Sequence, residues 1–163
     1  MLGLVWIGAG CISGCNTEAK KMSSDFVASS ECRHFALRSA PGEELKSSLQ
    51  QFVSSHNIKA AAIVTCVGSL TRANLRMADA KDGTPLEGKF EIVSLVGTLS
   101  PDGPHLHLSL SDENGKVVGG HIVDGCIVRT TAEIVIVELT DLEFRREQDA
   151  QTGYKELIIR QKR

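Results

Sequence analysis

From residue 60 onward, the sequence is a succession of strand-like segments separated by short turns. Segments 90–99 and 126–139 are rich in β-branched residues, segment 105–110 alternates strictly, and Gly, Pro, Asn and Asp gather between the segments, which is the pattern of β-strands joined by turns. The expected strands cover residues 33–38, 60–67, 71–78, 90–99, 105–110, 116–123, 126–139, 142–146 and 154–159. Strands that follow one another in this way favour a largely antiparallel sheet.

One segment has helical rather than strand periodicity. Its apolar residues recur at the spacing i, i+4, i+7 and i+8, which forms a single stripe on a helix: Leu45, Leu49, Phe52 and Val53. We expect a helix over residues 42–56, with Pro41 and two glutamates at its start and Asn57 closing it in a left-handed conformation. One helix and many strands predict the α+β fold class.

The chain of 163 residues has room for one domain, which we expect at 33–160. A linker at 22–32 would precede it and a basic tail at 161–163 would follow it. Residues 2–12 are apolar but too few to span a bilayer, which takes about 20 residues. Segment 1–21 is therefore expected to be a flexible N-terminal extension or a targeting segment, and both interpretations stay open.

Charge and cysteine content narrow the function classes. The net charge of −2 and the aromatic content of 4% disfavour proteins that hold nucleic acid by charge alone or by base stacking. The number of cysteines, five, is odd, and no two of them have CxxC spacing. Neither a disulfide framework nor a thiolate zinc finger is therefore indicated. Cys66 and Cys126 lie in apolar runs and are expected to be buried thiols. These features predict a reducing compartment, cytoplasmic or nuclear.

Three of the five histidines lie within 17 residues of each other. His105 and His107 are separated by one residue on an expected strand, so both imidazoles project from one face, while the leucines between and after them face the core. Two adjacent imidazoles are a natural start for a zinc site, which needs three or four N, O or S ligands. The alternative is a set of half-buried polar histidines on a solvated sheet face.

The position of His121 depends on the turn before it. A two-residue turn at Asn114-Gly115 would place His121 opposite Leu108, on the core side. A three-residue loop with Gly115 left-handed, or a bulge at Gly119-Gly120, would place it directly across from His107. The metal hypothesis therefore predicts one extra residue in this hairpin.

Several stretches carry a family resemblance, namely 88–95 (GKFEIVSL), 97–100 (GTLS), 103–109 (GPHLHLS) and 119–121 (GGH). Residues 37–38, 41–43, 68–70 and 149–153 fit the same pattern. Residues 33–160 thereby resemble the plants and prokaryotes conserved (PPC) domain. This domain follows AT-hooks in plant nuclear proteins and usually stands alone in bacteria and archaea.

The resemblance implies a strongly curved, mostly antiparallel sheet, one main amphipathic helix and assembly as a homotrimer. The fold would be similar to that of acetolactate decarboxylase, whose zinc is held by three histidines, two of them in an HxH pair. Carried over by motif, His105, His107 and His121 are the expected zinc ligands.

The resemblance also bears on partners. The segment from Gly88 to Val93 matches a plant motif used for protein contacts, with Lys89 where that motif has an arginine, and lysine cannot reproduce a bidentate arginine contact. The AT-hook core Arg-Gly-Arg-Pro does not occur in the sequence, so direct DNA binding is not expected despite the DNA-binding relatives.

Two functions follow as hypotheses. The first is a stand-alone homotrimer whose three-histidine zinc site binds or transforms a small molecule, with Glu91 as the catalytic general acid/base because it lies in the motif segment on an expected strand. The alternative is a non-catalytic trimeric protein-interaction module associated with DNA or chromatin regulation. The apolar segments 92–99 and 134–139 are expected to bury a subunit interface, the chain's own core, or both.

Overall fold

The computed structural model describes residues 27–162, and the predicted segment 1–21 lies outside the described residues. The described elements are one helix and eight strands, which confirms the α+β class. They follow one another as β1 (Cys32–Ser39), α1 (Leu45–Ser55), β2 (Ala61–Arg76), β3 (Thr84–Leu99), β4 (His105–Ser111), β5 (Val117–Ile122), β6 (Ile127–Leu139), β7 (Leu142–Gln148) and β8 (Lys155–Gln161). In this part of the chain, no helix is long and apolar enough to cross a membrane.

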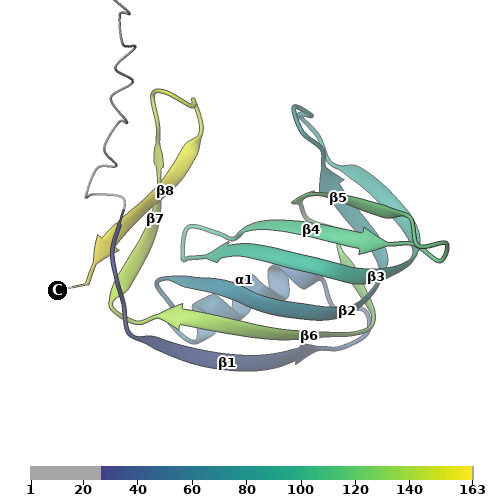
Figure 1. Cartoon of the computed structure of the whole chain (residues 1–163), viewed down its shortest axis with the longest axis horizontal. Helices are drawn as coiled ribbons and strands as arrows, with labels where there is room; N and C mark the ends of the chain where they lie inside the picture. The colour runs from purple at the N-terminus through teal and green to yellow at the C-terminus, as the bar shows by residue number, and fades with distance from the viewer. Residues whose placement is uncertain (1–26, 163) are drawn as a thin grey trace, which may run out of the picture.

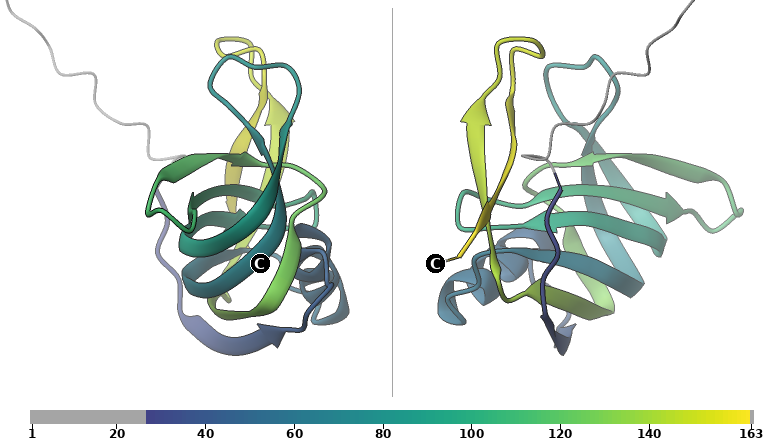
Figure 2. Two further views of the ribbon diagram at one scale, coloured as in Figure 1. Left: turned by 90° about the vertical axis from the view of Figure 1, so that its right-hand side faces the viewer. Right: turned by 60° about the vertical axis from the view of Figure 1, so that its left-hand side comes forward.

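Six strands form one antiparallel sheet in the order β1-β6-β2-β3-β4-β5. The sheet is strongly curved, as Figures 1 and 2 show, and its β5 edge returns to the end of β2. There Leu75 pairs with Ile122 and Arg76 pairs with His121. The curvature follows from β-bulges in β2 and β3, because a bulge bends a strand and increases its twist.

Strand β2 is continuous where the sequence predicts two strands, at 60–67 and 71–78. Gly68 does not break the strand but forms part of a bulge, with φ of +145°. A Cβ at this position would meet the carbonyl oxygen of Thr131 at 2.1 Å. The glycine is therefore required for the close approach of β2 to β6, and a turn signal in the sequence becomes a bend within one strand.

Helix α1 covers the side of the sheet opposite to the viewer in Figure 1. It begins at Leu45, later than predicted, because Glu44 acts as the N-cap: its Oε2 accepts a hydrogen bond from the Ser47 N–H at 2.6 Å. The predicted apolar stripe is buried through Leu45, Leu49 and Val53. Asn57 has the expected left-handed conformation, with φ of 53°.

The core fills the concave side of the sheet beneath α1. Leu106, Leu108 and Leu110 of β4 are at most 1% exposed, as the alternation of that strand predicts. Cys66 and Cys126 are buried there as free thiols, and burial raises the pKa of each to about 11. The opposite, outer face of β4 is consequently the one that carries the histidines.

The last two strands form a separate hairpin, β7-β8, as the sequence predicts. Leu142 and Phe144 anchor the base of the hairpin against Ala60 in a small second core. Asp102, in the turn between β3 and β4, accepts a hydrogen bond from the Arg146 N–H at 2.9 Å and so ties β7 to that turn. Figure 1 shows the hairpin standing beside the start of β4 rather than extending the sheet.

Candidate metal centre

The hairpin between β4 and β5 has the longer of the two predicted turns. Ser111 pairs with Val117, and the Asp112 N–H donates to the Lys116 carbonyl at 3.0 Å, which leaves a three-residue loop. Gly115 is left-handed in this loop, with φ of +78°. The two-residue turn is therefore wrong, and the extra residue expected for a metal site is present.

This register brings three histidines together on the outer face of the sheet. His107 of β4 pairs directly with His121 of β5. The ring centroids lie 5.4 Å apart for His105 and His107, 5.2 Å for His105 and His121, and 5.6 Å for His107 and His121. One ring nitrogen from each residue lies within 4.8 Å of the others. Three nitrogen donors on one face can share a metal ion and leave a further coordination position for a ligand.

The surroundings of His105 and His121 favour the neutral imidazole, which is the form that can bind a metal. Burial and the guanidinium of Arg76 lower the pKa of His121 to about 4. Burial and the positive charge of Arg146 also lower the pKa of His105. Nδ1 of His121 is buried and has no hydrogen-bond partner among the described residues. A neutral ring with an unpartnered nitrogen offers a lone pair, which is what a metal ligand must supply.

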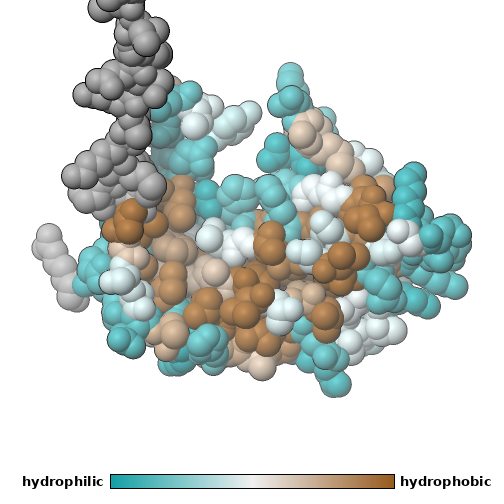
Figure 3. All heavy atoms as spheres, viewed as in Figure 1, coloured by the Kyte–Doolittle hydropathy of each residue, from teal (hydrophilic) through white to brown (hydrophobic). Residues whose placement is uncertain are grey.

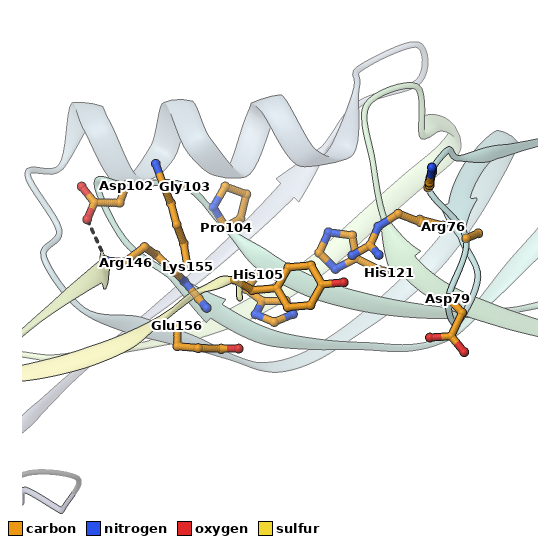
Figure 4. A pocket seen from close by; sticks show the side chains of 13 residues that line it. Arg76, Asp79, Asp102, Gly103, Pro104, His105, His121, Arg146, Lys155 and Glu156 are labelled. Atoms are coloured by element: carbon orange, nitrogen blue, oxygen red, sulfur yellow. Dashed lines mark hydrogen bonds between the residues drawn. The ribbon is translucent and has the colours of Figure 1, made fainter. Parts of the chain in front are cut away.

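A cavity of about 890 Å³ opens beside His105 and His121. It lies between the loop that joins β2 to β3 and the β7-β8 hairpin, and the space-filling view shows the molecule hollowed between these two projections (Figure 3). Figure 4 shows Arg146 on the His105 side of the cavity and Arg76 beside His121. A smaller cavity of about 300 Å³ borders His105 and His107.

Glu91 is not brought to the histidines. It is exposed on β3, where it pairs with Ser69 and Ser111, and it is absent from the residues that line the two cavities beside the cluster. Glu156 of β8 lines both cavities. Sequence analysis missed Glu156, because its place depends on how the β7-β8 hairpin folds against β4.

Arg76 and Arg146 were also missed by sequence analysis. Arg76 ends β2 and reaches His121 because β5 pairs with β2, and Arg146 belongs to β7. Neither arginine lies in a motif that points to a site. The strand pairing and the hairpin position that bring them to the cavity are long-range features.

Comparison with known proteins identifies relatives over most of the described residues. A family model, described as the Plants and Prokaryotes Conserved domain, matches residues 27–140. A hypothetical protein of Salmonella enterica is 48% identical, with a TM-score of 0.81 over 82% of this chain and 97% of that one. A metal-containing protein from Archaeoglobus fulgidus is 27% identical, with a TM-score of 0.70 over 81% of this chain and 98% of that one.

Two curated relatives are longer proteins. The bifunctional protein GlmU of Synechococcus is 42% identical over 127 residues, which are 78% of this chain and 20% of that protein. An AT-hook motif nuclear-localized protein of Arabidopsis thaliana is 31% identical over 104 residues, 58% of this chain and 31% of that protein. The chain thus spans a fifth to a third of the length of these relatives. The family match over residues 27–140 and the shared fold show that the chain belongs to the Plants and Prokaryotes Conserved domain family.

Proposed function

We propose that the chain is a homotrimeric PPC protein in which His105, His107 and His121 hold a zinc ion that binds or transforms a small molecule. The observation that carries the proposal is the convergence of three ring nitrogens within 4.8 Å of one another. The similarity to a metal-containing protein of Archaeoglobus fulgidus supports it.

The donor set fits zinc. All three groups are imidazoles, which suit zinc and other borderline metals, and the buried Nδ1 of His121 has no hydrogen-bond partner within residues 27–162. When bound, zinc would supply Lewis-acid activation of a carbonyl or of a water molecule. The cavity beside the cluster provides room for a small molecule next to the ligands.

Two carboxylates of the chain are candidates for the general acid/base. The role predicted for Glu91 stays a prediction, and this residue stands apart from the cavities. Glu156 lines both cavities beside the histidines, so we propose it as the second candidate for moving a proton to or from the bound molecule.

The homotrimer is supported by an apolar patch on the outer face of the sheet, which we call the valine face. It consists of Val64 and Val67 of β2 with Val93 and Val96 of β3, each more than half exposed, at 52–56%. Figure 3, which views the sheet from the side away from α1, shows hydrophobic residues gathered over its middle. An apolar patch of this kind is typical of a surface that another protein covers.

Metal analysis of the purified full chain tests the proposal. We expect about one zinc ion per chain, because three imidazoles form one site. The variant His107→Ala should lose the zinc and keep the molar mass of a trimer in light scattering. His34→Ala, which changes an exposed histidine of β1, is the matched control and should retain the metal. Zinc-free wild-type protein, or full zinc content in His107→Ala, would contradict the metal centre.

A second candidate function is the protein-interaction module. Lys89, Glu91 and Val93 are exposed in the segment that begins at Gly88, so this part of β3 is available to a partner. The AT-hook relatives associate the family with nuclear proteins. Metal-free protein that still binds a protein partner through this segment would favour the second function. For direct DNA binding, we expect little retention on an AT-rich duplex at physiological salt.

A further inference from the structure

The cavity beside the histidines is lined by more basic side chains than carboxylate side chains. Its basic residues come from the end of β2, the loop after it, β7 and β8, and they are Arg76, Lys81, Arg146 and Lys155. Its carboxylates are Asp79, Asp102 and Glu156. Asp102 is already engaged, because it accepts hydrogen bonds from the Arg146 N–H at 2.9 Å and from the Arg145 guanidinium at 3.3 Å.

Two of these four cations, both arginines, are half-buried, whereas Lys81 and Lys155 are exposed. Within residues 27–162, neither Arg76 nor Arg146 forms an ion pair with a carboxylate, although both are half-buried. Among the described residues, Arg146 Nη2 donates only to the hydroxyl of Thr98, at 3.1 Å. A half-buried guanidinium without an acidic partner carries a desolvation cost that an anion can offset.

The other arginines of the described residues behave differently. Four of them pair with glutamates, as Arg33–Glu138, Arg72–Glu87, Arg145–Glu143 and Arg160–Glu147. Arg38 and Arg129 have no ion pair, but both are exposed to water. Partial burial without a carboxylate partner therefore distinguishes the two arginines beside the cavity.

These two arginines stand on either side of the histidine cluster. Arg76 is the strand partner of His121, and Figure 4 shows its guanidinium next to that ring, whereas Arg146 lies on the His105 side. A metal ion held by the histidines would add positive charge between them. The mutual repulsion of these charges would be relieved by a negatively charged ligand.

We propose that the ligand of this cavity is a small organic anion whose acidic groups, carboxylate or phosphate, pair with Arg76 and Arg146 beside the histidines. The proposal rests on the proposed function and names the substrate class of the same site. Carboxylate and phosphate share the planar, bidentate recognition that guanidinium groups provide. A volume of about 890 Å³ admits a molecule considerably larger than a single phosphate ion.

Calorimetric titration of the full chain with three probes tests this class of ligand. Malonate represents carboxylates, inorganic phosphate represents phosphates, and malonamide is the uncharged analogue of malonate. We expect malonate or phosphate to bind wild-type protein and malonamide not to bind, and the anion that binds identifies the acidic group.

Substitution of the arginines links this binding to the cavity. Arg76→Gln and Arg146→Gln should each lower the affinity for the bound anion by about tenfold or more, because each removes a charge-assisted hydrogen bond. Arg129→Gln, at an exposed arginine of β6 outside the cavity, is the matched control and should bind like wild type. If Arg76→Gln fails to fold, Arg146→Gln carries the test, since Arg146 lies in the β7-β8 hairpin outside the six-stranded sheet.

Two results would overturn the proposal: neither anion binds wild-type protein, or both arginine variants bind as wild type does. Zinc content is measured on the same samples. Protein without zinc would contradict the proposed metal centre, while arginine-dependent anion binding by that protein would still support the anion cavity. The failures of the two proposals are therefore distinguishable.

Discussion

Gly97 of β3 lies directly against the backbone of His105. Its φ is +138°, and a Cβ there would meet the His105 carbonyl oxygen at 2.0 Å. Gly103, in the turn between β3 and β4, has φ of +115°, but a Cβ there would meet no heavy atom within 4 Å. Both glycines avoid backbone strain, whereas only Gly97 also provides space next to a proposed metal ligand.

We expect Gly97→Ala to lower the free energy of unfolding by about 3 kcal/mol or more, and Gly103→Ala by about 1 kcal/mol. The larger loss combines strain with the steric conflict at His105, which would also reduce zinc retention. Urea unfolding of metal-free protein gives the two free energies, and metal analysis gives the retention. Equal losses in the two variants would show that the contact at His105 contributes nothing.

At the scale of elements, the β4-β5 hairpin shows what the sequence pattern predicts and what it leaves open. The alternation of residues 105–110 predicts correctly that leucines face the core and that His105 and His107 share the other face. The position of His121 stays open at that level, because a change of one residue in the loop reverses its face. In the three-residue loop that forms, Asp112 Oδ1 accepts hydrogen bonds from the N–H groups of Asn114 and Lys116, each at 2.9 Å.

The residues of the cavity wall are harder to predict, because tertiary contacts bring them there. Arg76 reaches the histidines through the pairing of β2 with β5, which no local periodicity indicates. Arg146 and Glu156 reach the cavity because the β7-β8 hairpin stands beside β4 instead of joining the sheet. Glu91 shows the opposite case, since a motif position made it a candidate while the strand register keeps it beside Ser111.

The attachment of the β7-β8 hairpin should depend on pH. The hydrogen bond from the Arg146 N–H, assisted by Arg145, holds the pKa of Asp102 below its ordinary value of 3.8. A carboxylate with a lowered folded-state pKa contributes stability above its unfolded-state pKa, and this contribution is lost as the pH falls through the folded-state value. We therefore expect amide protection in β7 and β8 to decrease below pH 3.8, after correction for intrinsic exchange.

In Asp102→Asn, this protection should be lower already at neutral pH and should not fall further through the same pH range. Asp82→Asn, in the loop between β2 and β3, is the control and should follow wild type. Hydrogen exchange measured by mass spectrometry over a pH series distinguishes these outcomes. An unchanged pH profile in Asp102→Asn would mean that another group anchors the hairpin.

At the scale of the whole molecule, the valine face and the histidine cluster are continuous. Val96 is the strand partner of His107, so the apolar patch on β2 and β3 borders the proposed zinc ligands. Within segment 92–99, Ile92, Leu95 and Leu99 belong to the core, while Val93 and Val96 face outward, where the proposed trimer would cover them. A trimer built on this face would cover the side of the cluster next to His107.

A charge on the valine face should therefore dissociate the proposed trimer without unfolding the chain. In a closed ring of three subunits, Val67→Lys introduces a buried ammonium group at each of the three interfaces, where it also removes part of the roughly 1.5–3 kcal/mol that full burial of an apolar side chain contributes. Val67 is 55% exposed in the single chain, so the substitution leaves the core intact. Light scattering should give the mass of a monomer, and far-ultraviolet circular dichroism should match wild type.

Val117→Lys is the matched control for this experiment, because Val117 is exposed to a similar degree, 58%, but lies on β5 outside the valine face. It should remain trimeric. If Val67→Lys also remains trimeric, the subunits associate through another surface, and the valine face is then free to contact a different partner beside the histidines. Zinc content of the monomeric variant adds a further distinction: since all three proposed ligands come from one chain, we expect the metal to survive dissociation.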